Sequence, residues 1–313
     1  MKIIFMGTPD FAVHTLKAIH GAGHEIALVV TQPDRPKGRS RAMQMSDVKK
    51  CALKLGLEVF QPEKIRAENA VERLRECGSE LIVVAAFGQI LTREILDLPG
   101  YGCINVHASL LPGLRGASPI QTAILEGCKE TGVTIQQMGE GLDTGDIISQ
   151  KSIPIEPGDT GGSLFDKLAR LGAELLVETI DDIASGRAVM LPQDESLASY
   201  ARKIDKAMGL IDWNKSAEET ERLVRALNPW PSAYTYIDGR MLKIWRADTG
   251  EGSDAPPGTL IAVDKDQVTV SCKEGSLILR EVQLEGKKRM SVHDFLLGYE
   301  LKQGTVIKGK DGL

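Results

Sequence analysis

Several features that define common protein classes are missing from this chain of 313 residues. It contains no run of roughly 18 or more apolar residues, so a membrane-spanning helix is not expected. The sequence begins with a strand-like segment, Lys2–Phe5, which leaves no room for a signal or transit peptide. We therefore expect a cytoplasmic protein that has no membrane partner.

Paired cysteines and a strong positive charge are missing as well. The five cysteines are odd in number and none forms a Cys-x-x-Cys pair, so neither a disulfide framework nor a bound metal is expected. The net charge is −5, and residues 206–313 hold 16 basic and 16 acidic side chains. Any contact with a nucleic acid must therefore come from local basic patches, because the overall charge does not attract phosphates.

Up to about residue 185, strand-like and helix-like segments alternate. The strand candidates are short apolar runs, as expected for strands buried on both faces of a parallel sheet. Together with the helices between them they predict an α/β fold with a doubly wound, mostly parallel sheet of the Rossmann-like kind. The expected strands are Lys2–Met6, Glu25–Thr31, Glu58–Gln61, Leu81–Phe87, Cys103–His107 and Val133–Met138, and the expected helices are Phe11–Ala22, Ser46–Leu55, Ile65–Cys77, Ala117–Glu126 and Ser163–Ile183.

The pattern changes after that point, and the length of the chain also favours two domains. A helix is expected at Ala217–Leu227, followed by short alternating strands separated by turns such as Asp238-Gly239. This spacing predicts a small C-terminal β-barrel. We expect a first domain at 1–185, a connector at 186–205 and a second domain at 206–313, with strands at Ala233–Ile237, Met241–Ala247, Thr259–Val263, Gln267–Cys272 and Ser276–Leu284.

Residues able to support catalysis gather at the ends of two expected strands. Asn105 and His107 are two positions apart in Cys103–His107, so they share one face of that strand. Asp143 follows a second strand, in the run Gly-Leu-Asp-Thr-Gly-Asp. Each residue alone has a structural explanation, since a single histidine is usually structural and an aspartate among glycines is usually a turn former. Together they provide an amide donor, a base and a carboxylate, as acyl transfer requires.

These motifs resemble the formyltransferases that use 10-formyltetrahydrofolate. The resemblance spans Met1 to about Val306. The first strand ends in Gly7-Thr8-Pro9-Asp10 without the three-glycine dinucleotide fingerprint, which disfavours a Rossmann dehydrogenase. The resemblance is carried by Asn105-Val106-His107, Ser109-Leu110-Leu111-Pro112 and Leu142–Asp146, and it is narrowed to the branch that formylates initiator tRNA by Gly7–Ala12, Thr31–Pro36 and Asn228–Pro231.

The resemblance implies transfer of a formyl group from 10-formyltetrahydrofolate, a co-substrate, to the methionine amino group of initiator methionyl-tRNA. Asn105 would donate a hydrogen bond to the oxyanion, and His107 and Asp143 would divide the proton transfers. Because direct attack by an amine needs no covalent intermediate, Cys103 is expected to be a packing residue. A monomer without a metal is expected. The implied folate pocket consists of Ser109, Leu110, Leu111 and Pro112 on one wall and of Phe87 and Gln89 on the far side.

Basic residues suggest where the tRNA binds. From Arg35 to Ser46 the chain has no acidic residue, and loops as long as Pro33–Met45 inside compact domains are usually functional or disordered. A solvated basic loop without a partner is the alternative. The resemblance implies that this loop enters the acceptor stem and that the C-terminal domain is an OB-like barrel. The candidate tRNA-binding residues are Arg35, Lys37, Arg39 and Arg41 in the loop and Lys287, Lys288 and Arg289 after the last expected strand.

Three other functions remain open at this point. A glycinamide ribonucleotide formyltransferase shares the catalytic trio but should end soon after residue 185. A sugar-nucleotide formyltransferase, acting on amino sugars, also joins this core to a smaller C-terminal domain. A non-enzymatic RNA-binding protein would use the basic loop and barrel, but it would not need Asn105, His107 and Asp143 together.

Overall fold

The computed structural model describes residues 1–37 and 42–307, so Arg39 and Arg41 lie outside the described residues. The chain forms two compact units. The first consists of Met1–Pro119, Glu130–Pro154 and Phe165–Ala201, and the second of Ile120–Lys129, Ile155–Leu164 and Arg202–Leu313.

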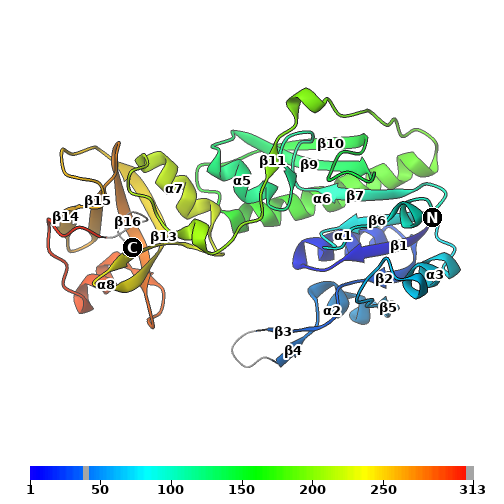
Figure 1. Ribbon diagram of the computed structural model, residues 1–313, viewed down its shortest axis with the longest axis horizontal. Coiled ribbons are helices and arrows are strands. Elements are labelled where there is room, and N and C mark those ends of the chain that lie inside the picture. The colour runs from blue at the N-terminus through cyan, green and yellow to red at the C-terminus, as the bar shows by residue number, and fades with distance from the viewer. Residues whose placement is uncertain (38–41, 308–313) are drawn as a thin grey trace. The chain divides into compact units, whose positions relative to one another are not determined.

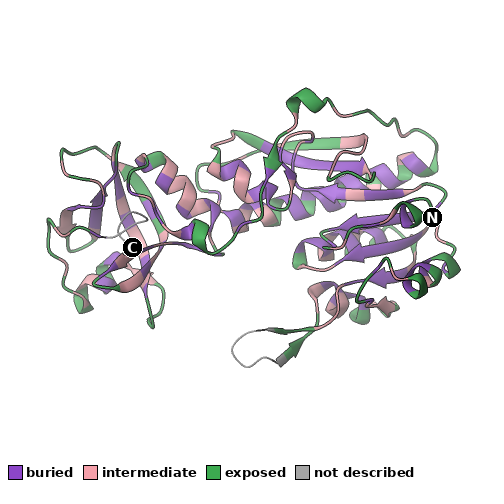
Figure 2. Cartoon of the chain, viewed as in Figure 1, coloured by how far each residue is buried: buried purple, intermediate pink, exposed green. Residues whose placement is uncertain are grey.

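A sheet forms the centre of the first unit, and its order within the described residues is β10-β9-β7-β6-β1-β2-β5 (Figure 1). The strands from β7 to β5 in this order are parallel, whereas β9 is antiparallel to both of its neighbours. The inner strands are almost entirely buried (Figure 2). The predicted mostly parallel α/β sheet is therefore confirmed. Its strands are β1 (Lys2–Gly7), β2 (Glu25–Val30), β5 (Val59–Phe60), β6 (Leu81–Ala85), β7 (Cys103–His107), β9 (Glu130–Gln137) and β10 (Ile147–Pro154).

Helices join most of these strands, and local sequence explains where they begin. For example, α2 starts after Ser46, whose hydroxyl accepts a hydrogen bond from the Lys49 amide at 3.0 Å. The expected basic loop contains a short antiparallel hairpin of β3 (Arg35–Lys37) and β4 (Ala42–Gln44), which extends away from the sheet in Figure 1. The helices are α1 (Asp10–Gly21), α2 (Asp47–Lys54), α3 (Glu68–Glu76), α4 (Arg93–Leu96), α5 (Pro119–Leu125) and α6 (Gly161–Ala184).

The second unit contains an antiparallel sheet with the order β12-β13-β16-β15-β14, and β17 pairs with β16. The expected C-terminal domain of antiparallel strands is confirmed; between residues 202 and 307 the strand path is open, with β12 and β14 at its ends. No helix in the described parts of the chain is both long and apolar enough to cross a membrane. The elements are α7 (Ala217–Ala226), β12 (Ala233–Ile237), β13 (Arg240–Gly250), β14 (Leu260–Asp264), β15 (Gln267–Ser271), β16 (Ser276–Leu284), β17 (Met290–Ser291) and α8 (Val292–Gly298).

Candidate active site

His107 ends β7, where it is 6% exposed and lies opposite Thr134 of β9. Its Nε2 atom is 3.0 Å from the carbonyl oxygen of Leu114. Because a carbonyl oxygen can only accept a hydrogen bond, Nε2 must carry the proton in this contact. Nδ1 is then the ring nitrogen that can take up or release a proton.

Asp143 approaches that nitrogen from the loop after β9. Its Oδ1 is 3.7 Å from His107 Nδ1, which is too long for a direct hydrogen bond but close enough for a strong charge interaction if the ring is protonated. Gln136 Nε2 donates to Oδ1 at 2.9 Å, and the Gly116 amide donates to Oδ2 at 2.8 Å. The structure therefore brings two of the three predicted catalytic residues together and holds the carboxylate in a fixed orientation.

Asn105 lies on the same face of β7, opposite Gln136. It is half-buried, and its carboxamide has no hydrogen-bond partner among the described residues. The Oε1 atom of Gln136, which is itself 2% exposed, also has no partner in that part of the chain. Two facing amides next to Asp143 thus keep unused hydrogen-bonding capacity, as a ligand site requires.

Cys103 shares this strand but belongs to the core. It is fully buried, and its Sγ donates to the carbonyl oxygens of Ile95 and Leu96 at 3.7 and 3.8 Å. Burial raises the pKa of this thiol to about 12, so it stays protonated and is a poor nucleophile. Cys103 is a packing residue.

The segment expected to form one folate wall uses most of its polar groups internally. The Ser109 hydroxyl donates to Gly113 O at 2.6 Å, and the Leu111 amide donates to Thr134 Oγ1 at 3.0 Å. Leu111 O accepts from Gln150 Nε2 at 2.7 Å. These bonds shape the loop that presents the Leu114 carbonyl to His107. A folate contact at Ser109, Leu110, Leu111 or Pro112 stays a prediction.

Phe87 and Gln89 follow the end of β6. Phe87 is 2% exposed, and it lines a cavity of about 550 Å³ together with Thr8. Gln89 accepts a hydrogen bond from the Ile65 amide at 2.7 Å, so its carboxamide holds a neighbouring loop. The next residue, Ile90, to which the sequence analysis assigns no role, is 86% exposed.

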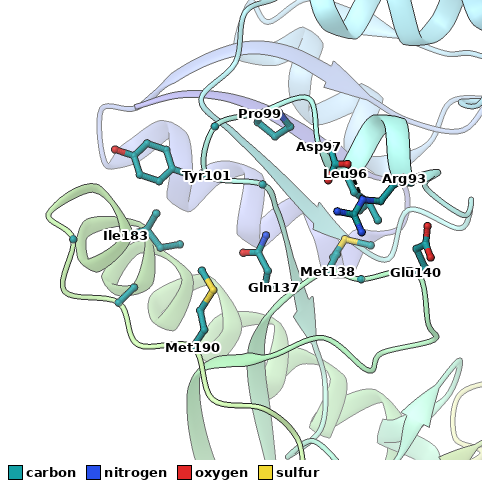
Figure 3. A pocket seen from close by; sticks show the side chains of 15 residues that line it. Arg93, Leu96, Asp97, Pro99, Tyr101, Gln137, Met138, Glu140, Ile183 and Met190 are labelled. Carbon is teal, nitrogen blue, oxygen red and sulfur yellow. Dashed lines mark hydrogen bonds and ion pairs between the residues drawn. The ribbon is translucent and has the colours of Figure 1, made fainter.

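A larger cavity, of about 680 Å³, opens beside the loop that carries Asp143. In Figure 3, Tyr101 and Met190 lie on one side of it, Arg93 and Glu140 lie on the other, and the Gln137 amide lies between them. Gln137 Oε1 is buried and has no partner in the described residues. Cavities of this size with a few unsatisfied polar groups are typical of small-molecule sites. None of the residues predicted for the folate pocket lines this cavity.

Two polar residues that were not predicted from the sequence, Gln136 and Arg115, contribute to the site. Thr134 and Gln136 alternate with the apolar residues Val133 and Ile135 on β9, and that alternation was a usable signal. Arg115 is fully buried next to Gly116, although an isolated arginine in a loop gives no local sign of burial. Among the described residues, no His, Cys, Asp or Glu side chains are grouped so that they could hold a metal ion.

Four of the candidate tRNA-binding residues have side chains that the structure describes: Arg35, Lys287, Lys288 and Arg289. In the first unit Arg35 is exposed on β3, paired in register with Gln44, and forms no ion pair with a described residue. Lys37 ends the same strand. In the second unit Lys287 and Lys288 are exposed in the turn after β16.

Arg289 has closer partners than the other candidates. It forms an ion pair with Glu281, and its guanidinium lies 4.9 Å from the centre of the Trp245 ring. Lys243 Nζ lies 5.7 Å from the same ring. Lys243 and Trp245 are not among the residues predicted from the sequence, although their spacing of two on an expected strand predicts a shared face.

Comparison with known proteins identifies the family of this chain. The family "Formyl transferase" matches residues 1–180, and "Formyl transferase, C-terminal domain" matches residues 203–300. A methionyl-tRNA formyltransferase of Lachnospira eligens is 51% identical over 313 residues, which covers 98% of this chain and 99% of the relative. The chain belongs to the methionyl-tRNA formyltransferase family. The family predicted from the motifs is thereby confirmed.

Further comparisons extend this finding. A methionyl-tRNA formyltransferase of Agathobacter rectalis is 54% identical over 306 residues, or 97% of this chain and 99% of the relative. Among solved structures, the sugar 3N-formyl transferase WlaRD has a TM-score of 0.67 at 22% identity, covering 92% of this chain and 99% of that one. At that identity the likeness shows a shared fold, whereas the methionyl-tRNA formyltransferases match in sequence through both units.

A substitution at Gly145 tests whether the close packing of this loop keeps the Asp143 carboxylate at the Gly116 amide. A Cβ atom added to Gly145 would lie 1.6 Å from Gln137 O, so Gly145→Ala should displace the loop and remove the Asp143 acceptor from the Gly116 amide. Exchange of the Gly116 amide, measured by NMR, should become at least about fivefold faster, as loss of a bond of about 1 kcal/mol predicts.

The matched control is Gly21→Ala, because nothing lies within 4 Å of a Cβ atom added there. This variant should leave Gly116 exchange unchanged. Equal exchange in wild type and Gly145→Ala would show that the loop does not depend on this close approach.

Proposed function

We propose that this protein transfers the formyl group of 10-formyltetrahydrofolate to the amino group of methionine on initiator methionyl-tRNA, in translation initiation. One observation carries the proposal. Asn105 and His107 share one face of β7 and Asp143 lies beside His107, in a chain that is 51% and 54% identical to proteins named methionyl-tRNA formyltransferase. All three residues belong to one chain, so a monomer suffices for this chemistry.

The reaction makes three demands on the site. The neutral amine forms a bond to the formyl carbon, and the bond from that carbon to the folate nitrogen breaks. The formyl oxygen gains negative charge before that bond breaks. One proton leaves the amine and one is taken up by the departing folate nitrogen, so the protons balance.

Asn105 meets the demand for an oxyanion donor. Its unpartnered carboxamide can donate a hydrogen bond to the developing charge, and losing one such donor typically slows catalysis by about 100- to 1,000-fold. His107 is assigned to proton transfer at Nδ1, because Nε2 is occupied by the Leu114 carbonyl. Asp143 stabilises the protonated ring and orients the amine.

The donor is assigned to the 680 Å³ cavity that adjoins the Asp143 loop. A flat heterocycle could contact the apolar side chains of Leu96 and Met138, and its polar edge could satisfy Gln137 Oε1. The exposed residues Ile90 and Leu142 would then cover the remainder of the donor. In this arrangement the Ser109–Pro112 segment supports the site by shaping the loop next to His107.

The tRNA is assigned to two basic surfaces. The first is the β3–β4 hairpin with Arg35 and Lys37, together with Arg39 and Arg41. The second surrounds Trp245, where Lys243 and Arg289 flank an aromatic ring and Lys287 and Lys288 follow in the adjacent turn. Cations contact phosphates, and an accessible ring offers a base a stacking surface that does not depend on sequence.

A sugar-nucleotide formyltransferase is the second candidate, since structures of that kind share the fold. Those structures are 20% and 22% identical to this chain, far below the identity of the methionyl-tRNA formyltransferases. The sugar substrate is therefore not favoured.

The catalytic assignment is tested by single substitutions assayed with 10-formyltetrahydrofolate and methionyl initiator tRNA. Asn105→Ala and His107→Ala should each lower kcat by at least about 100-fold, because each removes a group that acts mainly in the transition state. Asp143→Asn keeps the shape but removes the charge, so it should also be severely impaired.

Thermal unfolding of each variant serves as the control for folding. A folded variant that formylates at close to the wild-type rate would disprove the role given to that residue. If the wild-type protein formylated an amino-sugar nucleotide and left the tRNA unchanged, the function would instead be that of a sugar-nucleotide formyltransferase.

The Trp245 surface is tested by tRNA binding at several salt concentrations. Trp245→Ala should weaken binding by about 1–3 kcal/mol, because a stacking contact is lost. The slope of log affinity against log salt concentration should stay the same, because no phosphate contact is lost. Lys287→Ala combined with Lys288→Ala should weaken binding and make the slope shallower by up to about one unit per phosphate contact.

Trp230→Ala is the control, since Trp230 is another tryptophan of the second unit and is 54% exposed, whereas Trp245 is half-buried. Its binding should equal that of the wild type. Unchanged affinity in Trp245→Ala would exclude this ring from the RNA surface.

A further inference from the structure

One segment of the first unit matches neither family model. We call residues Gln193–Ala201 the strap. The N-terminal family match ends at residue 180 and the C-terminal family match begins at residue 203, so the strap lies between them. The strap nevertheless belongs to the same compact unit as the catalytic trio. Its last residues, β11 (Tyr200–Ala201), pair in parallel with β8 (Arg115–Gly116).

Arg115 joins the strap to the active-site loop through a fully buried guanidinium. Nη1 and Nη2 donate to the two carboxylate oxygens of Glu195 at 2.9 and 2.8 Å. Nε and Nη2 donate to Gln193 Oε1 at 3.1 and 2.8 Å. The bidentate geometry fixes both partners in orientation as well as in position.

Gln193 uses its other atom on the catalytic loop. Its Nε2 donates to the backbone carbonyl oxygens of Asp143 and Gly145, at 2.8 and 2.7 Å. Asp143 has a left-handed backbone, with φ of 53°, a conformation that costs a non-glycine residue about 1 kcal/mol or more unless its surroundings hold it. One bond from Gln193 is made to this strained residue and the other to Gly145, two positions along the same loop.

The strap also reaches the partner of His107. Ser199 Oγ accepts a hydrogen bond from the Leu114 amide at 2.9 Å, and Ser199 O accepts one from the Arg115 amide at 2.8 Å. Leu114 is a second left-handed non-glycine residue, with φ of 58°, and its carbonyl is the acceptor for His107 Nε2. One short segment therefore contacts the supports of both His107 and Asp143.

We propose that the strap sets the relative position of His107 and Asp143, and that Gln193 and Ser199 are its positioning residues. Gln193 holds the backbone of Asp143, whereas Ser199 holds the residue that orients the imidazole. The effect on turnover rests on the proposed function, but the effect on loop position stands on geometry alone.

Gln193→Glu separates this role from simple packing. The new side chain keeps an oxygen for Arg115 but loses both donors to Asp143 O and Gly145 O. If Gln193 only satisfied Arg115, this variant would behave like wild type. Under the proposal, kcat falls by at least about tenfold, KM for either substrate stays within about twofold, and the melting temperature stays within about 4 °C of wild type.

Hydrogen exchange followed by mass spectrometry gives a readout that does not need activity. Peptides covering residues 141–146 should exchange faster in Gln193→Glu than in wild type. The matched control is Gln303→Glu, because Gln303 Nε2 also donates to a backbone carbonyl, Ile261 O, at 2.9 Å but lies in the second unit. That variant should leave both kcat and the exchange of this loop unchanged.

Ser199→Ala tests the second contact independently, and it decides the proposal if Gln193→Glu does not fold. It should lower kcat, and Ser199→Thr, which keeps the hydroxyl, should restore it. The proposal would be overturned if Gln193→Glu or Ser199→Ala showed the exchange and turnover of the wild type. Faster exchange without a change in kcat would also overturn it. Failure of the wild type to formylate the tRNA would instead reject the proposed function, and the exchange data would still decide the strap.

Discussion

The hydrogen bond from His107 Nε2 to the Leu114 carbonyl determines how the rest of the site can work. Because Nε2 carries the proton, the free lone pair of the neutral ring is on Nδ1, which lies 3.7 Å from Asp143 Oδ1. A neutral ring in that orientation offers the carboxylate no proton, whereas a protonated ring gains a favourable charge interaction.

Two strained residues make this geometry possible. Leu114 and Asp143 both adopt left-handed backbones, which non-glycine residues rarely do. Each is held by groups that are distant in sequence: Ser199 supports Leu114, while the Gly116 amide and Gln193 support Asp143. Strain maintained in this way is characteristic of functional sites. The surrounding sheet supplies the rigid frame, because β7 is paired on both sides along the length that carries Asn105.

The sequence predicts the features that depend on local periodicity. Buried apolar runs indicate the parallel strands, and the spacing of Asn105 and His107 indicates their shared face. Contacts between distant residues leave no such signal. Arg115 and Gln193 are 78 positions apart, and the sequence around either residue does not indicate that the two are in contact. The polar strand β10 was missed for a related reason, since its outward side chains do not form an apolar run. The cavity beside Gln137 likewise depends on segments that converge only in the fold.

The most direct test of this account is the tautomer of His107, measured by ¹⁵N NMR on protein labelled at histidine. In the neutral ring, Nε2 should carry the proton and Nδ1 should show the shift and couplings of an unprotonated nitrogen. On protonation, both nitrogens should become donors. A neutral ring with its proton on Nδ1 would contradict the account, because Leu114 would then lose its donor and His107 could not accept a proton on the side that faces Asp143.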